Sequence, residues 1–555
     1  VEPKGESGGA DGLVMGSVAG SVTGSTLDLG GRTAVGSTAP GLVLVNQSLT
    51  GANGVMLTAE NGDLNLTSTT VTATAGTASL TALVNPPGPA PAPLPGIILT
   101  GASAVSAVAS SGMDGVTLTA DRVDLTGTVN AGAKRVVILP STLTRPISLG
   151  GTDETGKLNL TPTELNNITA GVIVVGRSDM TGGITLESGT PMGLTAPALS
   201  LIQSNTASIT QVPTSGLNIA GLNADAGSVS LMAANNSIGA ISGNATTLFE
   251  MANMGPITVG AVDVVSGINA GGSTAGVSLL SGTGGITQLA GSPLVGGSVM
   301  LTPGVGQSVV LNEPGNSMTG LSVLATSGGS IALANANTGT TTLQADANGT
   351  LTYKGAGAVQ IVSASAGSAL ASPLFGAGAL SIEAGSMSVT GSGVSSAGSV
   401  HLKANAGGVG SSGTPMPVTA PGGVWAQATG GGVFLATPQS DLLVTGLTTS
   451  GGGASLVTTS GSPGTLHLQN ANVGGTLGWS GFTQASLGAG GGQVGATGAI
   501  SAPTDVVLAG TLAPGGIGAV GSVTVGGNLT VLNGATLHFD FNGASNDSIS
   551  VTGVT

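Results

Sequence analysis

Gly227-Ser228-Val229-Ser230-Leu231-Met232, or GSVSLM, is the kind of phrase that decides the fold of this chain. Strict alternation places Val229 and Leu231 on one face of an extended segment and the two serines on the other. The phrase therefore predicts a short, half-buried strand. Related phrases recur as GVTLTA at Gly115, GITLES at Gly183, GVSLLS at Gly276, GSVMLT at Gly297, GSIALA at Gly329, GSVHLK at Gly398, GVFLAT at Gly432 and GTLHLQ at Gly464.

The spacing of these phrases indicates a repeat architecture. Their first aliphatic residues are 22 to 69 residues apart, close to multiples of about 11, which is one short strand plus one connection. A fixed period with glycine-rich turns is typical of a solenoid whose units bury their apolar faces against their neighbours. We expect an all-β fold, a right-handed parallel β-helix forming a single elongated domain, with roughly 22 to 33 residues per coil.

The composition fits this fold. Only 2% of the 555 residues are aromatic and 6% are charged, whereas 40% are hydrophobic. A β-helix core is a narrow stack of Val, Leu, Ile and Ala, so it needs few aromatic residues. Although there are 100 glycines and 26 prolines, hydrophobic residues that alternate in register argue against disorder. No apolar run is long enough for a transmembrane helix.

Charge and cysteine content narrow the choice of partners and compartment. The net charge is −14, with 24 acidic and 10 basic residues, which argues against nucleic acid and anionic membranes as partners. The chain has no cysteine, so it has neither disulfides nor thiolate chemistry. That absence fits export as an unfolded chain. The start at Val1 shows no signal peptide, and we expect this sequence to be a segment of a longer polypeptide.

One break in composition divides the sequence. Residues 85–96, NPPGPAPAPLPG, contain six prolines, which cannot donate to a strand ladder and favour an extended conformation. We expect them to leave the solenoid as a loop or linker; a recognition site for a proline-binding partner is the alternative. The predicted organisation is coils over 1–84, this segment over 85–96, β-helix repeats over 97–500, and a different repeat over 501–555.

The last repeat carries a family resemblance. GTLAPGG from Gly510, GSVTVGGNLTVLNGATLHFDFNG from Gly521 and NDSISVTG from Asn546 resemble the passenger-associated repeat of bacterial autotransporters. GSVHLKANAGGVGSSGTPMPVTAPGGVWAQATGGGVFLAT from Gly398 resembles the looser repeats of filamentous-haemagglutinin-like secreted adhesins. The resemblance implies a β-helical passenger secreted by a type V route to the bacterial cell surface, at the outer membrane. The N-terminal secretion domain and the membrane translocator of these families are not recognisable here, and the translocator is expected elsewhere in the full-length protein.

Short glycine motifs carry little weight in a chain this rich in glycine. Gly5 to Gly9 fits G-x-S-x-G, but no strand leads into it and no histidine is near in sequence. Gly490 to Gly495 fits G-x-G-x-x-G without a βαβ context. His401, His467 and His538 each lie between aliphatic residues, so alternation turns them outward as solvated residues several coils apart, too far to share a metal.

Acidic and aromatic residues were weighed for polysaccharide chemistry. The densest charged patch is Asp121-Arg122-Val123-Asp124, followed by Asp153-Glu154. A carbohydrate-active enzyme would need clustered carboxylates or a Ca²⁺-bridged base, and the related stretches of other coils are Gly, Ser, Thr and Ala. Three aromatic residues that could form a platform are isolated in the sequence: Tyr353, Trp425 and Trp479. We expect no catalytic, cofactor-binding or metal-binding residues, and no cofactor.

A threonine-rich stretch is the most distinctive polar array. TSTTVTATAGTASLTA, from Thr67 to Ala82, places threonines at alternate positions. Because threonine is a good strand former, an exposed β-face is the simplest interpretation. A flat ladder that pairs with another chain or orders water, as in ice-binding solenoids, is the alternative.

Three functions follow from these observations. The first is a rigid extracellular stalk of a secreted bacterial surface protein, acting in adhesion or self-association, whose partners are other copies of itself or surface receptors. The second is an S-layer or other surface-lattice protein. The third is a polysaccharide-active enzyme on a β-helix scaffold. The absence of an evident active site favours the first.

Overall fold

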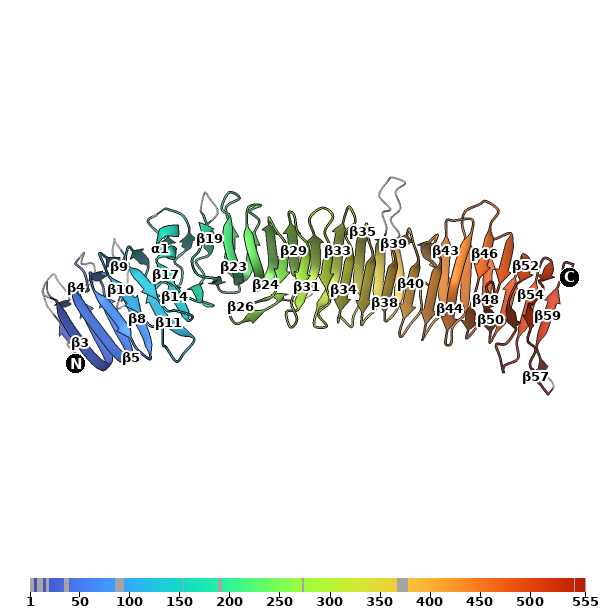
Figure 1. Ribbon diagram of the computed structural model, residues 1–555, viewed down its shortest axis with the longest axis horizontal. Coiled ribbons are helices and arrows are strands. Elements are labelled where there is room, and N and C mark those ends of the chain that lie inside the picture. The colour runs from blue at the N-terminus through green and yellow to red at the C-terminus, as the bar shows by residue number, and fades with distance from the viewer. Residues whose placement is uncertain are drawn as a thin grey trace. The chain divides into compact units, whose positions relative to one another are not determined.

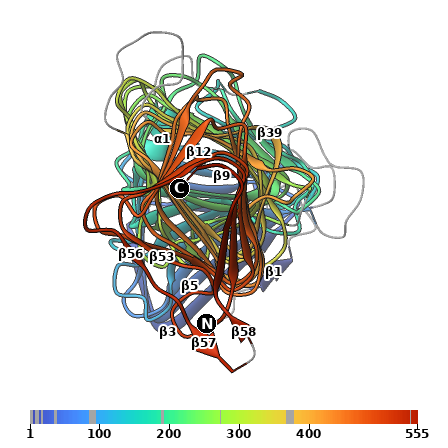
Figure 2. The same ribbon diagram turned by 90° about the vertical axis from the view of Figure 1, so that its right-hand side faces the viewer.

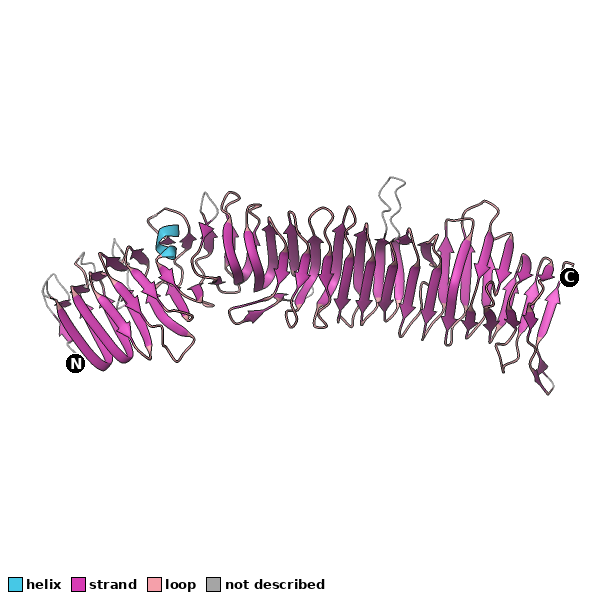
Figure 3. Ribbon diagram, viewed as in Figure 1, coloured by secondary structure: helices cyan, strands magenta, loops and turns pink. Residues whose placement is uncertain are grey.

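The computed structural model describes residues 4–6, 13–15, 19–33, 39–84, 94–152, 154–187, 192–271, 274–366, 378–543 and 545–554. It is a parallel β-solenoid of about 22 turns, with 58% of residues in strands and 1% in helix. The predicted all-β parallel solenoid is therefore confirmed. Figure 3 shows strands throughout and one short helix in the described part of the chain.

The chain forms two compact units. The first comprises residues 1–282 with 289–295, and the second comprises 283–288 with 296–555. Each unit is built from coils whose strands pair in parallel with the equivalent strands of the next coil (Figure 1). Because every coil has its hydrogen-bonding partner in its neighbour, sequential coils supply both the backbone ladder and the core.

The first coils of unit 1 have three walls. One wall is a five-stranded sheet made of β2 (Leu13–Met15), β4 (Leu42–Val45), β6 (Leu64–Thr67), β9 (Gly96–Thr100) and β12 (Arg122–Leu125). The second contains the first halves of β3 (Gly20–Arg32) and β5 (Gln47–Glu60), then β7 (Thr70–Ala73), β10 (Ala104–Ser106), β13 (Thr128–Asn130) and β17 (Ile168–Thr169). The third contains the second halves of β3 and β5, then β8 (Thr77–Leu83), β11 (Asp114–Thr119), β14 (Arg135–Leu139), β18 (Val172–Gly176), β21 (Ala198–Ile202), β23 (Leu217–Leu231) and β24 (Ser237–Asn253).

Shorter strands complete unit 1. They are β1 (Lys4–Glu6), β15 (Ile147–Leu149), β16 (Leu158–Leu160), β19 (Ile184–Leu186), β20 (Met192–Gly193), β22 (Ser208–Gln211), β25 (Ile257–Val259), β28 (Ile268–Ala270), β29 (Gly276–Ser281) and the antiparallel pair β26 (Ala261–Val262) and β27 (Val265–Ser266). Helix α1 (Pro162–Asn166) begins with a capping box between Thr161 and Glu164. The Glu164 carboxylate also accepts a hydrogen bond from the backbone of Leu125 at 3.1 Å, so α1 is attached to the coil below it.

Unit 2 repeats the same plan. One series of paired strands is β30 (Ile286–Gln288), β32 (Val309–Leu311), β34 (Ile331–Asn335), β36 (Leu351–Gly355), β38 (Leu380–Ala384), β40 (Val400–Ala404), β42 (Val424–Ala428) and β44 (Leu442–Thr449). A second series is β31 (Leu294–Thr302), β33 (Ser317–Ala325), β35 (Thr341–Ala347), β37 (Val359–Ala366), β39 (Met387–Ser396), β41 (Met416–Thr419), β43 (Val433–Thr437), β45 (Ala454–Thr458), β48 (Leu477–Ser480), β51 (Ala499–Ala502), β54 (Ser522–Val525) and β59 (Ser548–Val551).

At β44 the first series divides in two. The first half of β44 is followed by β46 (Thr465–Leu468), β49 (Gln484–Leu487), β52 (Asp505–Leu508) and β55 (Leu529–Val531). The second half is followed by β47 (Ala471–Val473), β50 (Gln493–Ala496), β53 (Thr511–Ala513) and β56 (Thr536–Leu537). The stretch from Ser501 thus continues the coils, and a hairpin of β57 (Phe541–Asn542) and β58 (Ser545–Asn546) projects from them (Figure 2).

Coil length lies at the short end of the expected range. Leu42 pairs with Leu64 and Val309 with Ile331, each 22 residues further on. Leu64 pairs with Ile97, 33 residues on, and the additional residues lie between β8 and β9. Residues 85–93 of the proline-rich segment lie outside the described residues, and Gly96, predicted to belong to it, is the first residue of β9. Since β6 pairs directly with β9, the segment joins adjacent coils.

The core consists of aliphatic ladders along each unit. In unit 1 one ladder runs through Val55, Ala78, Val116, Val136, Ile173, Leu199, Leu222 and Ile241, and all of them are buried. The conserved phase of alternation explains the ladder, because each inward position stacks on the same position one coil away. Not every phrase enters the same ladder, however: β31, with Val299, pairs with β33, whereas β34, with Ile331, pairs with β32 and β36.

Candidate functional site

The acidic patch singled out in the sequence holds corners of the solenoid together. Asp121 is 1% exposed and accepts hydrogen bonds from the backbone N–H of Thr142, at 2.9 Å, and from its hydroxyl. Arg122 pairs with Asp63 at 2.7 Å, and Asp63 also accepts from the backbone of Gly96. These contacts link three adjacent coils, and they account for the charged groups without invoking catalysis.

The other charged residues are similarly occupied. Glu154 pairs with Lys157 at 2.8 Å, and Lys157 also contacts Glu187 at 2.9 Å; Asp153 lies outside the described residues. The histidines are on separate strands or turns, and the described part of the chain contains no group of His, Asp and Glu that could hold a metal ion. Of the G-x-S-x-G motif only Gly5 and Glu6 are described, in β1.

The G-x-G-x-x-G motif at Gly490 lies in a turn that leads into a strand. Gly490 and Gly491 have φ values of 75° and 85°, which favour glycine, and Gln493 then begins β50. A dinucleotide fingerprint would open a helix here, so these glycines serve the turn.

The threonine-rich stretch contributes to a face that spans six coils of unit 1. Its outward residues, exposed or half-buried, form two adjacent columns, Ser21, Ser48, Thr70, Ala104 and Thr128, and Thr23, Thr50, Thr72, Ser106, Asn130 and Thr169. None of these residues is charged, and all are small. The array does not use every threonine of the stretch, because Thr69 is fully buried and its hydroxyl donates to the backbone of Leu44.

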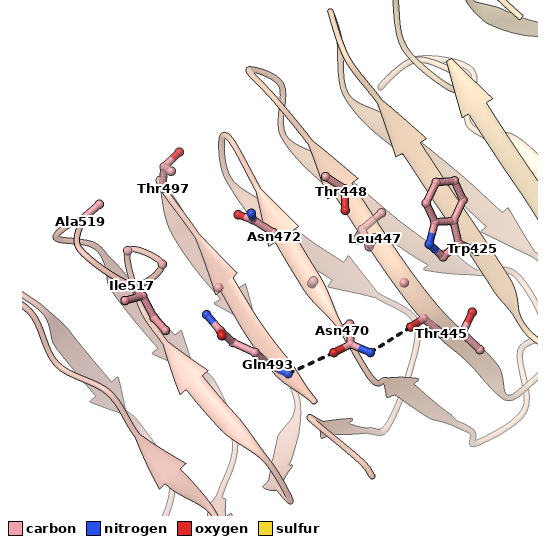
Figure 4. Close-up of a pocket in the computed structure, with 15 residues that line it drawn as sticks. Trp425, Thr445, Leu447, Thr448, Asn470, Asn472, Gln493, Thr497, Ile517 and Ala519 are labelled. Atoms are coloured by element: carbon pink, nitrogen blue, oxygen red, sulfur yellow. Dashed lines mark hydrogen bonds between the residues drawn. The ribbon is translucent and has the colours of Figure 1, made fainter. Parts of the chain in front are cut away.

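A groove of about 520 Å³ lies on the wall formed by β44, β47 and β50 in unit 2. Figure 4 shows one row of polar residues along it, Thr445, Asn470 and Gln493, and a second, Thr448, Asn472 and Thr497. The amide of Asn470 donates to the carbonyl of Thr445 and accepts from the backbone of Gln493, both at 3.3 Å. These two bonds run from coil to coil, so the first row is held in register.

The hollow shape of the groove depends on glycines. A Cβ at Gly446 would lie 2.5 Å from Cδ1 of Trp425, and one at Gly495 would lie 2.9 Å from the carbonyl of Ala513. Strand β44 has one extra residue here, because Val424 pairs with Val444 whereas Trp425 pairs with Gly446, a bulge that redirects the chain. At the opposite end the turn around Ile517, which is 64% exposed, closes the groove.

Trp425 stands at one end of the groove and rests on His401 of the preceding coil. The two rings are parallel within 5°, with centroids 4.0 Å apart. Burial lowers the pKa of His401, Lys403 lowers it further, and Glu383 opposes the shift. His401 points outward as predicted, but it is stacked and partly buried rather than solvated.

The remaining aromatic residues have different environments. Tyr353 and Trp479 are 2% and 4% exposed and belong to the core. Burial raises the pKa of Tyr353, although Asn335 and Thr341 hydrogen-bond to it. Trp425 is therefore the aromatic side chain, among the three considered in the sequence, that is placed to face a ligand.

Unit 1 has a second groove, of about 480 Å³, beside Asp225 and Asn244. The Asp225 carboxylate accepts from the backbone and the side chain of Asn244, each at 2.8 Å. Gln203 lines this groove with its side chain buried, and neither polar atom of its amide has a partner among the described residues. This groove contains a carboxylate and no aromatic residue.

Sequence reasoning missed both grooves. Asn470, Asn472 and Gln493 belong to different coils, and a linear pattern does not show that they align. The register could have been found by superimposing the 22-residue coils, which places outward amides over one another.

Comparison of the chain with protein-family models, curated proteins and solved structures finds no match. Within the described residues, no helix has the length and apolar character needed to cross a membrane. The parallel solenoid fold fits a rigid, stalk-like structural protein.

Proposed function

We propose that this chain is a stalk-forming segment of a secreted bacterial surface protein and that it acts in adhesion or self-association. Support for the stalk comes from the fold, because uninterrupted backbone ladders join coil to coil within each unit. Such ladders resist bending of a stack, as each coil is hydrogen-bonded along its walls.

The observation that carries self-association is the uncharged face containing Thr50 and Thr72. It is a regular array of small polar side chains across six coils. A flat surface of this kind can pack against its counterpart on a second copy without burying a charge, which would be costly. We therefore place the contact between copies on this face.

Sedimentation velocity of the purified chain over a concentration series tests the proposal. We expect association that increases with concentration and is unchanged by EDTA. Thr72→Lys should weaken association because it places a charge at the centre of the face. Thr117→Lys is the matched control, since Thr117 is also a half-buried, outward residue at the middle of a strand, on a different wall.

Two results would contradict the proposal. A chain that stays monomeric at every concentration would remove self-association. Robust cleavage of a polysaccharide in a parallel screen would show that the molecule is an enzyme, and formation of two-dimensional arrays would favour a surface lattice.

A further inference from the structure

We infer that the groove between Trp425 and Ile517 binds a neutral oligosaccharide. This inference rests on the adhesion part of the proposed function and gives it a ligand class. The first argument is the absence of charge: every residue that lines the groove is apolar, a glycine, a threonine, an asparagine or a glutamine. A site for a sulfated or carboxylated polymer would be expected to offer Lys or Arg, which pair with such anions.

The second argument concerns hydrogen-bonding capacity. The side-chain amides of Asn472 and Gln493 are exposed, and each offers two N–H donors and a carbonyl acceptor. Sugar hydroxyls both donate and accept, so paired amides and threonine hydroxyls match them. Pockets that combine shape with a few converging polar groups are the usual form of small-ligand sites.

The third argument is the aromatic end. One face of Trp425 is covered by His401, and the next residue on the other side is Gly446, which has no side chain. The second face of the indole is thus turned toward the groove, as its position in Figure 4 shows. A flat, rigid aromatic face with a polar N–H provides contact area for the apolar face of a pyranose ring at low entropic cost.

The direction of the groove favours a chain-like ligand. Trp425, Thr448, Asn472 and Gly495 lie on successive coils, and adjacent strands are about 4.8 Å apart. The polar rows therefore repeat along the coil axis and can contact successive rings of a short oligosaccharide. The lining offers no carboxylate, whereas glycoside hydrolysis uses a pair of them, so we expect binding without cleavage.

Tryptophan fluorescence offers a direct test. The chain has two tryptophans, and Trp479 is buried, so a Trp479→Phe variant reports on Trp425 alone. We would titrate this variant with cellohexaose, maltohexaose, mannohexaose and the hexamer of N-acetylglucosamine. At least one should change the emission saturably and protect Trp425 from acrylamide quenching. Heparin, polygalacturonate and an extended Ser/Thr peptide should not.

Matched variants assign the binding to the groove by calorimetry with the best hexasaccharide. Trp425→Ala should weaken binding at least about tenfold, and Gln493→Ala about three- to tenfold, the loss expected for a hydrogen bond. Gln484→Ala is the control, because Gln484 is also the exposed first residue of a strand in the same coil but lies outside the groove. It should bind as the parent does. If Trp425→Ala does not fold, Gln493→Ala with Asn472→Ala decides.

The inference fails if no neutral hexasaccharide binds, if binding survives the groove substitutions unchanged, or if the acidic polymers or the peptide bind there instead. Release of shorter sugars would overturn binding without cleavage. Sedimentation of the same samples without glycan keeps the two proposals separate, because self-association can persist when glycan binding is absent.

Discussion

At the scale of single residues, buried asparagines fasten the coils to one another. Asn236 is fully buried; its carbonyl accepts from the backbone of Leu217 at 2.9 Å, and its amide donates to the carbonyls of Leu231 and Ala252. We predict that Asn236→Ala lowers the free energy of unfolding by about 3 kcal/mol or more, because each buried partner left unpaired costs about 1–3 kcal/mol. Urea unfolding measures this, with the exposed Asn472→Ala as a control expected within about 0.5 kcal/mol of the parent. Equal effects of the two substitutions would show that the buried amide is dispensable.

His401 gives a pH dependence of known sign. Since burial against Trp425 lowers its pKa, the unfolded chain binds a proton more readily than the folded one. His401 therefore makes no unfavourable contribution above about pH 6.5, its ordinary pKa, and it reduces stability as the pH falls from there through its folded pKa. An NMR titration should give His401 a pKa below the ordinary value, and Trp425→Ala should raise it by exposing the imidazole. A pKa for His401 that Trp425→Ala leaves unchanged would contradict this.

At the scale of elements, the corner between β8 and β9 separates length from function. The equivalent corner between β5 and β6 is only three residues long, Asn61–Asp63, whereas residues 84–95 join β8 to β9. Because β6 pairs with β9 directly, we predict that replacing residues 84–95 by Asn-Gly-Asp leaves the thermal midpoint within a few degrees of the parent. Differential scanning calorimetry measures the midpoint. Replacing β7 (Thr70–Ala73) in the same way is the control and should be strongly destabilising, and a large loss from the first replacement would show that the proline-rich segment stabilises the coils.

The elements also show how far sequence reasoning reaches. Alternation in phrases such as GSVSLM predicts the strands and their inward residues, because burial follows the two-residue period. It does not assign a strand to a wall: Val299 and Ile331 share a pattern yet belong to different series. The groove was missed for a related reason, since a bulge at Thr445 sets its register and a bulge is a tertiary adjustment with no signal in the local pattern.

At the scale of the whole molecule, repeat architecture predicts unfolding in parts. Coils contact their neighbours in sequence, so stability adds up locally and cooperativity does not need to extend through the chain. Both tryptophans, Trp425 and Trp479, lie in unit 2. Tryptophan emission thus reports on unit 2, whereas far-UV circular dichroism reports on both units.

We predict that the two signals do not coincide during urea unfolding and that substitutions affect them selectively. Val229→Asp buries an unpaired charge in unit 1, and Ile331→Asp does so in unit 2, at residues that are 0% and 1% exposed. Val229→Asp should shift the dichroism transition and leave the fluorescence midpoint near that of the parent. Ile331→Asp should lower the fluorescence midpoint. Ser228→Asp, on the outward face beside Val229, should change neither by much. If Val229→Asp lowers the fluorescence midpoint as much as Ile331→Asp does, the chain unfolds as one cooperative body, and the nearest-neighbour account of its stability is wrong.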